Sequence, residues 1–154
     1  MNRQVADTRH LCAGLLVLAL LWSLALPAAE PLPQVQFTFD SGQVLEVEVA
    51  ATRPAQMRGL MLREYLAEQA GMLFVLSAEQ SRHCFWMRDT FIPLSLGFLD
   101  AQFTLLEILE LQPLDETPRC SHQPAAYALE VNRGWFERQG MQPGMRFEPS
   151  VPLL

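Results

Sequence analysis

The sequence contains no lysine, and its eleven basic residues are all arginine, against seventeen acidic residues and a formal net charge of −6. The arginines are scattered, and no basic run occurs. Nucleic acids and anionic membranes both require clustered positive charge on the protein surface. We therefore expect neither a nucleic acid nor an anionic lipid surface as a partner.

Sequence motifs of the common hydrolases and nucleotide-binding proteins are also missing. The chain has no G-x-S-x-G, no H-E-x-x-H and no P-loop. His83 precedes Cys84 and His122 follows Cys120 closely, but neighbours on a strand point to opposite faces and make poor nucleophile pairs. The carboxylates are scattered, and spacing alone pairs none of them. The sequence therefore assigns no catalytic residue, and we expect no cofactor.

Methionine and histidine raise the question of a copper site, because thioether and imidazole ligands suit Cu(I). However, the chain has no Met-x-x-Met repeat and no pair of histidines at ligand spacing. Most of the methionines occupy positions where the apolar periodicity already predicts core. We therefore expect no metal.

The N-terminal segment has the composition of a secretory signal. Arg3 and Arg9 precede an apolar run from Leu11 to Leu26, and small residues follow it. The run is shorter than the roughly twenty residues of a spanning helix, so we predict a signal peptide over residues 1–29 and one globular domain over residues 30–154. The alternative is an uncleaved N-terminal membrane anchor.

Cleavage would give an exported protein, periplasmic or secreted, with no stable membrane insertion. Loss of residues 1–28 removes two arginines and one aspartate, so the net charge changes from −6 to −7. It also removes Cys12 and leaves Cys84 and Cys120, an even pair that favours a disulfide in an oxidising compartment. Two free thiols are the alternative.

Hydrophobic periodicity predicts a β-rich domain. Alternation predicts a hairpin of strands over 35–39 and 44–49, and further strands over 72–76, 83–88, 94–99, 103–111, 125–131 and 145–147. Helical spacing of apolar residues predicts one helix from Thr52 to Tyr65. A second, short helix is predicted from Asn132, a possible N-cap residue, to Gln139. About seven short strands with two short helices indicate a compact β-sandwich or small barrel.

Four ordered blocks carry a family resemblance. They are Arg58-Gly59-Leu60-Met61 followed by Arg63, Gly71-Met72-Leu73-Phe74, Phe85-Trp86-Met87-Arg88-Asp89-Thr90 with Ile92-Pro93-Leu94, and Tyr127 to Glu130. In this order they resemble the motifs of the "domain of unknown function 192" family, over roughly Val35 to Phe147. The resemblance implies a compact, mostly β fold in a small and often exported domain, and it implies no established activity.

Two positions depart from the pattern of that family. Asp89 stands where relatives usually have asparagine, and Ser95 stands where they usually have an acid. If that acid were a general base or a metal ligand in relatives, this chain would lack it.

The best candidate for a ligand-binding site is Trp86 with Arg88, Asp89 and Thr90. An indole beside a guanidinium and a carboxylate suits a sugar ring or a small polar anion. Arg58 and Arg63, on the predicted helix, are further candidates for contacts to an anion. The alternative is that Trp86 is a core residue and that Arg88 and Asp89 only stabilise a turn.

Three functions remain open from the sequence. The first is a non-catalytic binding or accessory module for a small polar or saccharide-like ligand. The second is an envelope hydrolase that uses Asp89, Asp100 or Glu130 as acid or base. The third is a structural or assembly partner without a small-molecule site. A pocket with two carboxylates roughly 5–10 Å apart would favour the hydrolase, and one with a single carboxylate and arginines would favour binding. The oligomeric state is left open.

Overall fold

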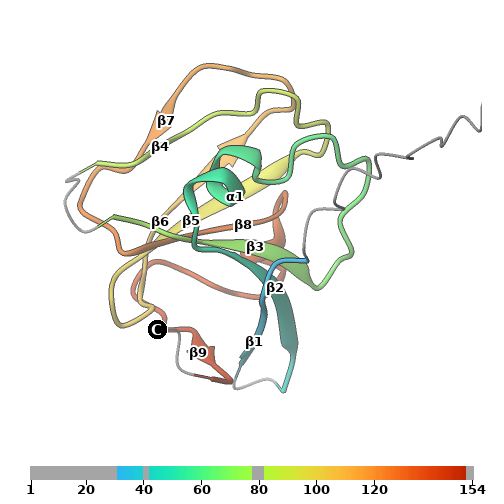
Figure 1. The fold of residues 1–154 in the computed structure, drawn as a ribbon. Coiled ribbons are helices and arrows are strands. Elements are labelled where there is room, and N and C mark those ends of the chain that lie inside the picture. The colour runs from blue at the N-terminus through green and yellow to red at the C-terminus, as the bar shows by residue number, and fades with distance from the viewer. Residues whose placement is uncertain (1–30, 40–41, 78–81, 152–154) are drawn as a thin grey trace, which may run out of the picture. The chain divides into compact units, whose positions relative to one another are not determined.

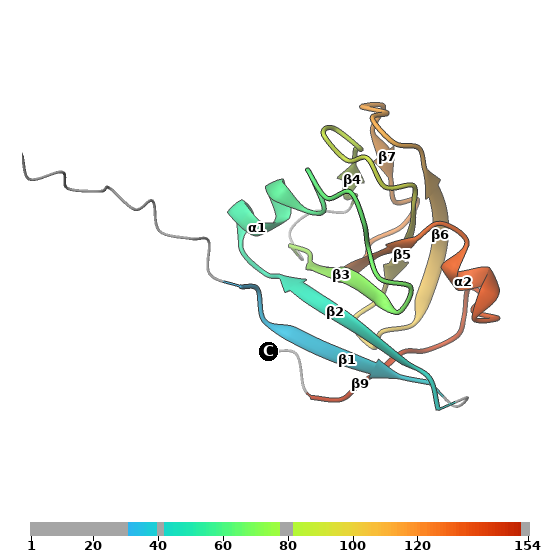
Figure 2. The same ribbon diagram turned by 90° about the vertical axis from the view of Figure 1, so that its right-hand side faces the viewer.

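Seven strands form one sheet, curled into a half-barrel, in this computed structural model (Figures 1 and 2). The structure describes residues 31–39, 42–77 and 82–151, so the predicted signal peptide over residues 1–29 lies outside it. The strands of the sheet are β1 (Gln34–Thr38), β2 (Val44–Ala50), β3 (Ala70–Val75), β5 (Leu94–Leu99), β6 (Leu105–Leu111), β8 (Tyr127–Asn132) and β9 (Glu148–Pro149). Strands β4 (Cys84–Phe85) and β7 (Arg119–Cys120) form a second, two-stranded sheet. The helices are α1 (Arg53–Arg58) and α2 (Trp135–Arg138).

The predicted mostly β fold class is confirmed. Among the described residues, none of the helices has the length and hydrophobicity needed to cross a bilayer.

The sheet has the order β6-β5-β8-β3-β2-β1-β9. The predicted hairpin of β1 and β2 is confirmed, and β2 pairs with β3 in parallel after the chain crosses over through α1. The predicted strand over 103–111 contains β6, which lies at the edge of the sheet and pairs with β5.

The C-terminal segment covers part of this edge. The backbone N–H groups of Gly144 and Phe147 donate to the carbonyls of Leu105 and Phe103, and Thr104 forms a bridge with Arg146. The chain then pairs with β1 through β9, so one segment contacts both ends of the sheet. The predicted last strand over 145–147 is therefore displaced to Glu148–Pro149. Coverage of this kind protects the unpaired backbone groups of edge strands.

Both faces of the central strands are buried. On β3, Leu73 belongs to the apolar cluster that contains Trp135 and Phe37, whereas Met72 and Phe74 belong to a second cluster on the opposite face. Gly71 permits a close approach within the sheet, because a Cβ atom at this position would lie 2.6 Å from the backbone oxygen of Glu130. The alternation of side chains along a strand therefore separates two cores.

Helix α1 is shorter than predicted. Thr52 Oγ1 accepts a hydrogen bond from the Ala55 N–H at its start, as expected for a cap, but the helix ends at Gly59, where φ is +48°. The spacing of Met57, Leu60, Met61 and Tyr65 predicted a helix to Tyr65, and this was wrong: Leu60 is buried, whereas Tyr65 is 76% exposed. The residues after the helix make long-range contacts instead of helical ones. One of these is a hydrogen bond from the N–H of Leu62 to the carbonyl of Asp89.

The two-stranded sheet is joined by the predicted disulfide. Cys84 and Cys120 are directly opposite each other on β4 and β7, and their sulfur atoms are bonded. Strand β4 ends at Phe85, so the strand predicted over 83–88 was too long, and Trp86 lies just after it. Residues 88–89 form a turn, in which Asp89 has a φ of +52°. In both views α1 and the β4–β7 pair lie over the same side of the large sheet (Figures 1 and 2).

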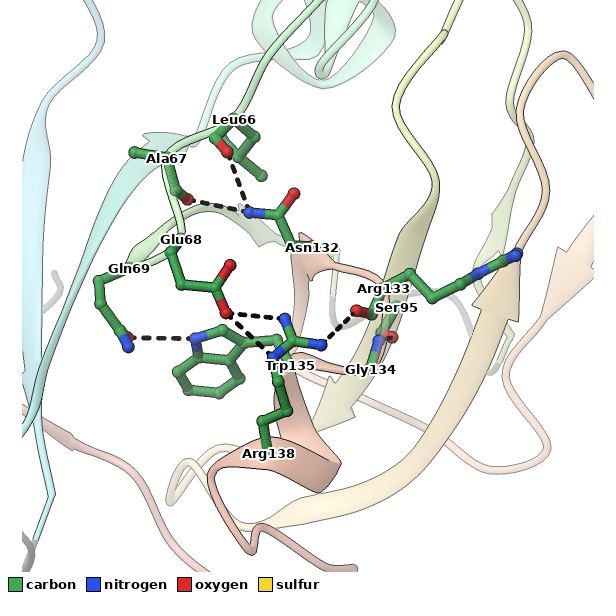
Figure 3. A network of polar contacts seen from close by, with 10 residues as sticks. All are labelled: Leu66, Ala67, Glu68, Gln69, Ser95, Asn132, Arg133, Gly134, Trp135 and Arg138. Carbon is green, nitrogen blue, oxygen red and sulfur yellow. Dashed lines mark hydrogen bonds and ion pairs between the residues drawn. The ribbon is translucent and has the colours of Figure 1, made fainter.

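The segment that leads from α1 into β3 is held at its far end by a polar network around α2 (Figure 3). Asn132 Nδ2 donates to the carbonyls of Leu66 and Ala67, at 3.0 and 2.9 Å. The indole N–H of the fully buried Trp135 donates to Gln69, and Arg138 binds Glu68. The network therefore holds the end of the segment that follows α1 against β8 and α2.

Candidate functional site

A cavity of about 680 Å³ lies between α1, the ends of β3 and β8, and the segment that contains β4. Its lining residues come from α1 and the turn after it, from β3 and β8, and from both sides of the disulfide: Arg53, Gln56, Met57, Arg58, Gly59, Leu60, Met61, Phe74, Leu76, Ser77, His83, Cys84, Phe85, Trp86, Thr90, Pro118 and Glu130. This volume is in the usual range for sites that bind small molecules. A second cavity of about 290 Å³, lined by Ile108, Phe136 and their neighbours, contains none of the predicted site residues.

Glu130 is a carboxylic acid in an apolar part of the sheet. On β8 it alternates with Leu129 and Val131, which face the cluster around Trp135, so its side chain faces the other core and the cavity. The residues opposite it are Met72 on β3 and Leu96 on β5. Within the described part of the chain it forms no hydrogen bond or ion pair. It is 5% exposed, and burial raises its pKa to about 8.

Aromatic rings form one wall of the cavity. The rings of Phe74 and Phe85 meet edge to face with their centroids 5.0 Å apart. Trp86 is 43% exposed, so the alternative in which it is a core residue is wrong. The guanidinium carbon of Arg88 lies 5.0 Å from the centre of the indole, an arrangement typical of a cation–π contact. The disulfide of Cys84 lies in the same wall and fixes the strand from which Trp86 extends.

Helix α1 supplies positive charge to the lining of the cavity. Arg53 and Arg58 both line the cavity and are exposed to solvent, and neither forms an ion pair with another described residue. Gln56 anchors the helix, because its side-chain amide donates to the backbone carbonyls of Ala50 and Val75 at the ends of β2 and β3. The two guanidinium groups are therefore available to an anion on a helix whose position is fixed by the sheet.

Three residues with positive φ lie around the turn after Trp86. They are Leu62, Asp89 and Leu114, whose φ angles are +61°, +52° and +61°. The N–H of Leu62 donates to the carbonyl of Asp89, and the N–H of Leu114 donates to the carbonyl of Thr90. Non-glycine residues in this region cost free energy, which surrounding contacts must offset. These hydrogen bonds hold the turn and thereby place Trp86 and Thr90 at the cavity.

The structure brings together only part of the predicted ligand-binding set. Trp86, Thr90 and Arg58 line the cavity, and Arg88 stacks on Trp86 without lining it. Asp89 does not line the cavity and contributes through its backbone. Arg63 turns away from it and donates two hydrogen bonds to Glu48, at 2.6 and 2.7 Å. Hydrogen bonds to Glu48 raise the pKa of Arg63 above its usual value.

The carboxylates named for a hydrolase are not brought together. Asp100 lies in the turn between β5 and β6 and accepts hydrogen bonds from the N–H groups of Gln102 and Thr104. Although desolvation acts to raise it, these hydrogen bonds lower the pKa of Asp100. Among the described residues that line the cavity, Glu130 is the only acid.

Ser95, the position at which the family resemblance implied an acid, has a structural role here. Ser95 donates to Glu110 at 2.6 Å and accepts a hydrogen bond from the N–H of Gly134 at 2.8 Å. It alternates along β5 with Leu94 and Leu96, which face the core on the cavity side, so it lies on the other face of the sheet.

Three features of the cavity follow only from the structure: the place of Glu130 in it, the part that Arg53 takes, and the pairing of Phe74 with Phe85. A glutamate within the apolar run Ala128-Leu129-Glu130-Val131 is the one signal that could have found the first from the sequence. Met57, Met61 and His83 also line the cavity. In the described ranges, no cluster of three or more His, Cys, Asp or Glu side chains could hold a metal.

Two solved structures share this fold and a substantial part of the sequence. A protein of unknown function from Novosphingobium aromaticivorans DSM 12444 is 35% identical, with a TM-score of 0.69, and the match covers 79% of this chain and 89% of that one. A protein from Sinorhizobium meliloti 1021, described as a "putative transcription regulator", is 33% identical, with a TM-score of 0.67, and the match covers 76% of this chain and 92% of that one. No curated protein matches the chain.

The family comparison agrees with the resemblance inferred from the four sequence blocks. The model of an uncharacterised family matches residues 35–149, which includes every strand from β2 to β9 and most of β1. The chain therefore belongs to the domain of unknown function 192 family.

Proposed function

We propose that the protein is a non-catalytic binding module that takes a small polar or saccharide-like ligand into the cavity beside Trp86. The observation that carries the proposal is the nearly buried carboxyl of Glu130, which has no polar partner among the described residues, in a cavity of about 680 Å³ with a half-exposed indole at its wall. A buried polar group without a partner costs free energy, and a ligand with a hydrogen-bonding group would offset that cost. The flat face of an indole suits a sugar ring.

The alternatives find less support. Paired-carboxylate hydrolysis needs a second acid, and Asp89 and Asp100 lie outside the cavity. A purely structural partner would not need a cavity of this size with a buried carboxyl group in its lining. The acidic net charge and scattered arginines argue against nucleic acid as the ligand.

We also propose that the module works outside the cytoplasm after cleavage near Ala28 or Ala29. The Cys84–Cys120 disulfide supports this, since such bonds persist in oxidising compartments. The intact mass of the protein recovered from a periplasmic fraction tests it. A mass that retains residues 1–28 would favour the membrane anchor instead.

A thermal-shift screen tests the binding function. The purified protein is heated with neutral monosaccharides, sugar acids, amino sugars and amino acids, each at millimolar concentration. We expect at least one compound to raise Tm by several degrees, because a ligand at 100 times its Kd stabilises by about 2.7 kcal/mol.

Two variants locate the effect. Trp86→Ala should abolish the shift, whereas Phe91→Ala, which changes an aromatic residue of similar exposure outside the cavity, should retain it. A shift that survives in Trp86→Ala, or no shift with any compound, would contradict the proposal.

A further inference from the structure

The lining of the cavity contains both cationic and acidic groups. Arg53 and Arg58 of α1 are cationic and have no ion-pair partner among the described residues. Glu130 of the sheet is acidic, and its side chain lies between Met72 and Leu96. Aromatic rings from Phe74, Phe85 and Trp86 lie in the same lining.

We infer that the ligand is amphoteric: it carries an amine that pairs with Glu130 and an anionic group that binds Arg53 and Arg58. This rests on the proposed binding function and narrows its ligand class. A ligand with only an anion would leave the buried carboxyl group of Glu130 without a polar partner. A ligand with only a cation would be repelled by the two arginines.

The aromatic wall supports the amine independently of Glu130. Ammonium groups are attracted to the faces of aromatic rings, and the attraction is strongest for tryptophan and in desolvated sites. Arginine side chains are suited to carboxylate and phosphate because the planar guanidinium can donate two parallel hydrogen bonds. An amino sugar phosphate and an ω-amino acid both have this combination of groups.

The inference has a consequence for protons. Burial raises the pKa of Glu130 to about 8, so the carboxyl is neutral at pH 6.5 without a cation beside it. An ammonium group beside it would favour the ionised form, and binding should release the carboxyl proton to the solvent. The other charged or titratable groups of the described cavity lining are Arg53, Arg58 and His83, and the residues opposite Glu130 on β3 and β5 are apolar.

Calorimetry with two matched series tests the ligand class. The sugar series is glucosamine 6-phosphate, glucose 6-phosphate, glucosamine and glucose, which varies the amine and the anion separately. The linear series is 6-aminohexanoate, hexanoate and 1-aminohexane. We expect the amphoteric member of at least one series to bind ten times or more tightly than its singly charged relatives.

Titration of 6-aminohexanoate at pH 6.5 in two buffers of different ionisation enthalpy counts the protons. We expect nearly one proton to be released per bound ligand in the wild type and none in Glu130→Gln. His83→Asn should retain the release, which separates Glu130 from the other titratable side chain of the cavity.

The variants also separate the two ends of the ligand. Glu130→Gln should remove the tenfold preference for the amine while changing the affinity for glucose 6-phosphate less than twofold. Arg58→Gln should remove the preference for the anion. Equal affinity across a series, proton uptake in place of release, or binding of none of these probes would overturn the inference. Binding of a neutral sugar that Trp86→Ala abolishes would overturn it too, but would leave the proposed function standing.

Discussion

Glu130 on β8 lies directly opposite Leu96 on β5, and Met72 lies opposite it on β3, so this carboxyl group is flanked by apolar side chains within the sheet. Its burial is nearly complete, with 5% of its surface exposed. A carboxyl group buried among apolar side chains destabilises the folded protein once it ionises, because the charge loses its hydration. It therefore does not contribute to the stability of the fold in its ionised form. This is the feature of the molecule that points most directly to function.

The first prediction concerns stability against pH. The folded pKa of Glu130, about 8, lies above its unfolded value of 4.5, so the folded state binds the proton more tightly. The contribution of Glu130 to stability is therefore fully present below about pH 4.5 and is lost as pH rises through 8. The loss is up to roughly 5 kcal/mol. Urea unfolding of the wild type and of Glu130→Gln between pH 4.5 and 9 measures it.

Glu130→Gln serves as the reference, because every other titrating group contributes equally to the pH dependence of both proteins. The difference in unfolding free energy between the two proteins should shift in favour of Glu130→Gln as pH rises. A difference that stays constant over this range would show that the carboxyl ionises normally.

The second prediction concerns the disulfide. The Cys84–Cys120 bond closes a loop with a sequence separation of 36 residues, and the chain-entropy model assigns such a loop about 4 kcal/mol of stability. The double variant Cys84→Ser, Cys120→Ser should therefore lose about this much unfolding free energy in urea titrations. It should also weaken ligand binding, since Cys84 and Trp86 lie in the same cavity wall.

Mass spectrometry provides the direct check of the bond. The unreduced protein, processed as proposed, should be two hydrogens lighter than the thiol form. Modification of Cys84 and Cys120 by iodoacetamide without prior reduction would contradict the bond.

The third prediction separates two arginines that the sequence placed in one group. Arg63 binds Glu48 with two hydrogen bonds, whereas Arg58 lines the cavity. Arg63→Gln should lower the unfolding free energy by about 1 kcal/mol, the upper range for partly exposed ion pairs, and leave binding unchanged. Arg58→Gln should leave stability unchanged and weaken the binding of anionic compounds from the screen.

Unfolding curves and binding titrations of both variants check this division of roles. The same loss of affinity in Arg63→Gln and Arg58→Gln would place both side chains at the ligand. No loss of stability in Arg63→Gln would mean that its ion pair with Glu48 is without net effect.

The local sequence pattern is sufficient to predict the β1–β2 hairpin, the disulfide and the family of this protein. The β1–β2 hairpin follows from alternating apolar residues, because successive side chains on a strand point to opposite faces. The Cys84–Cys120 pairing was predicted from the two cysteines that lie after the predicted signal peptide, and the structure contains this bond. The motif blocks that contain Trp86 and Glu130 are sufficient to indicate the family to which the chain belongs.

Only the tertiary structure decided where the helix ends, where Trp86 lies and what Glu130 faces. Helix α1 stops at Gly59 because contacts from Asp89 and Glu48 draw the following residues away from helical geometry. Glu130 lines the same cavity as Arg58 and Trp86 only because the sheet order places β8 beside β3, beneath α1 and the disulfide. Contacts between residues far apart in the sequence depend on how the elements pack, and periodicity along the chain carries no information about that packing.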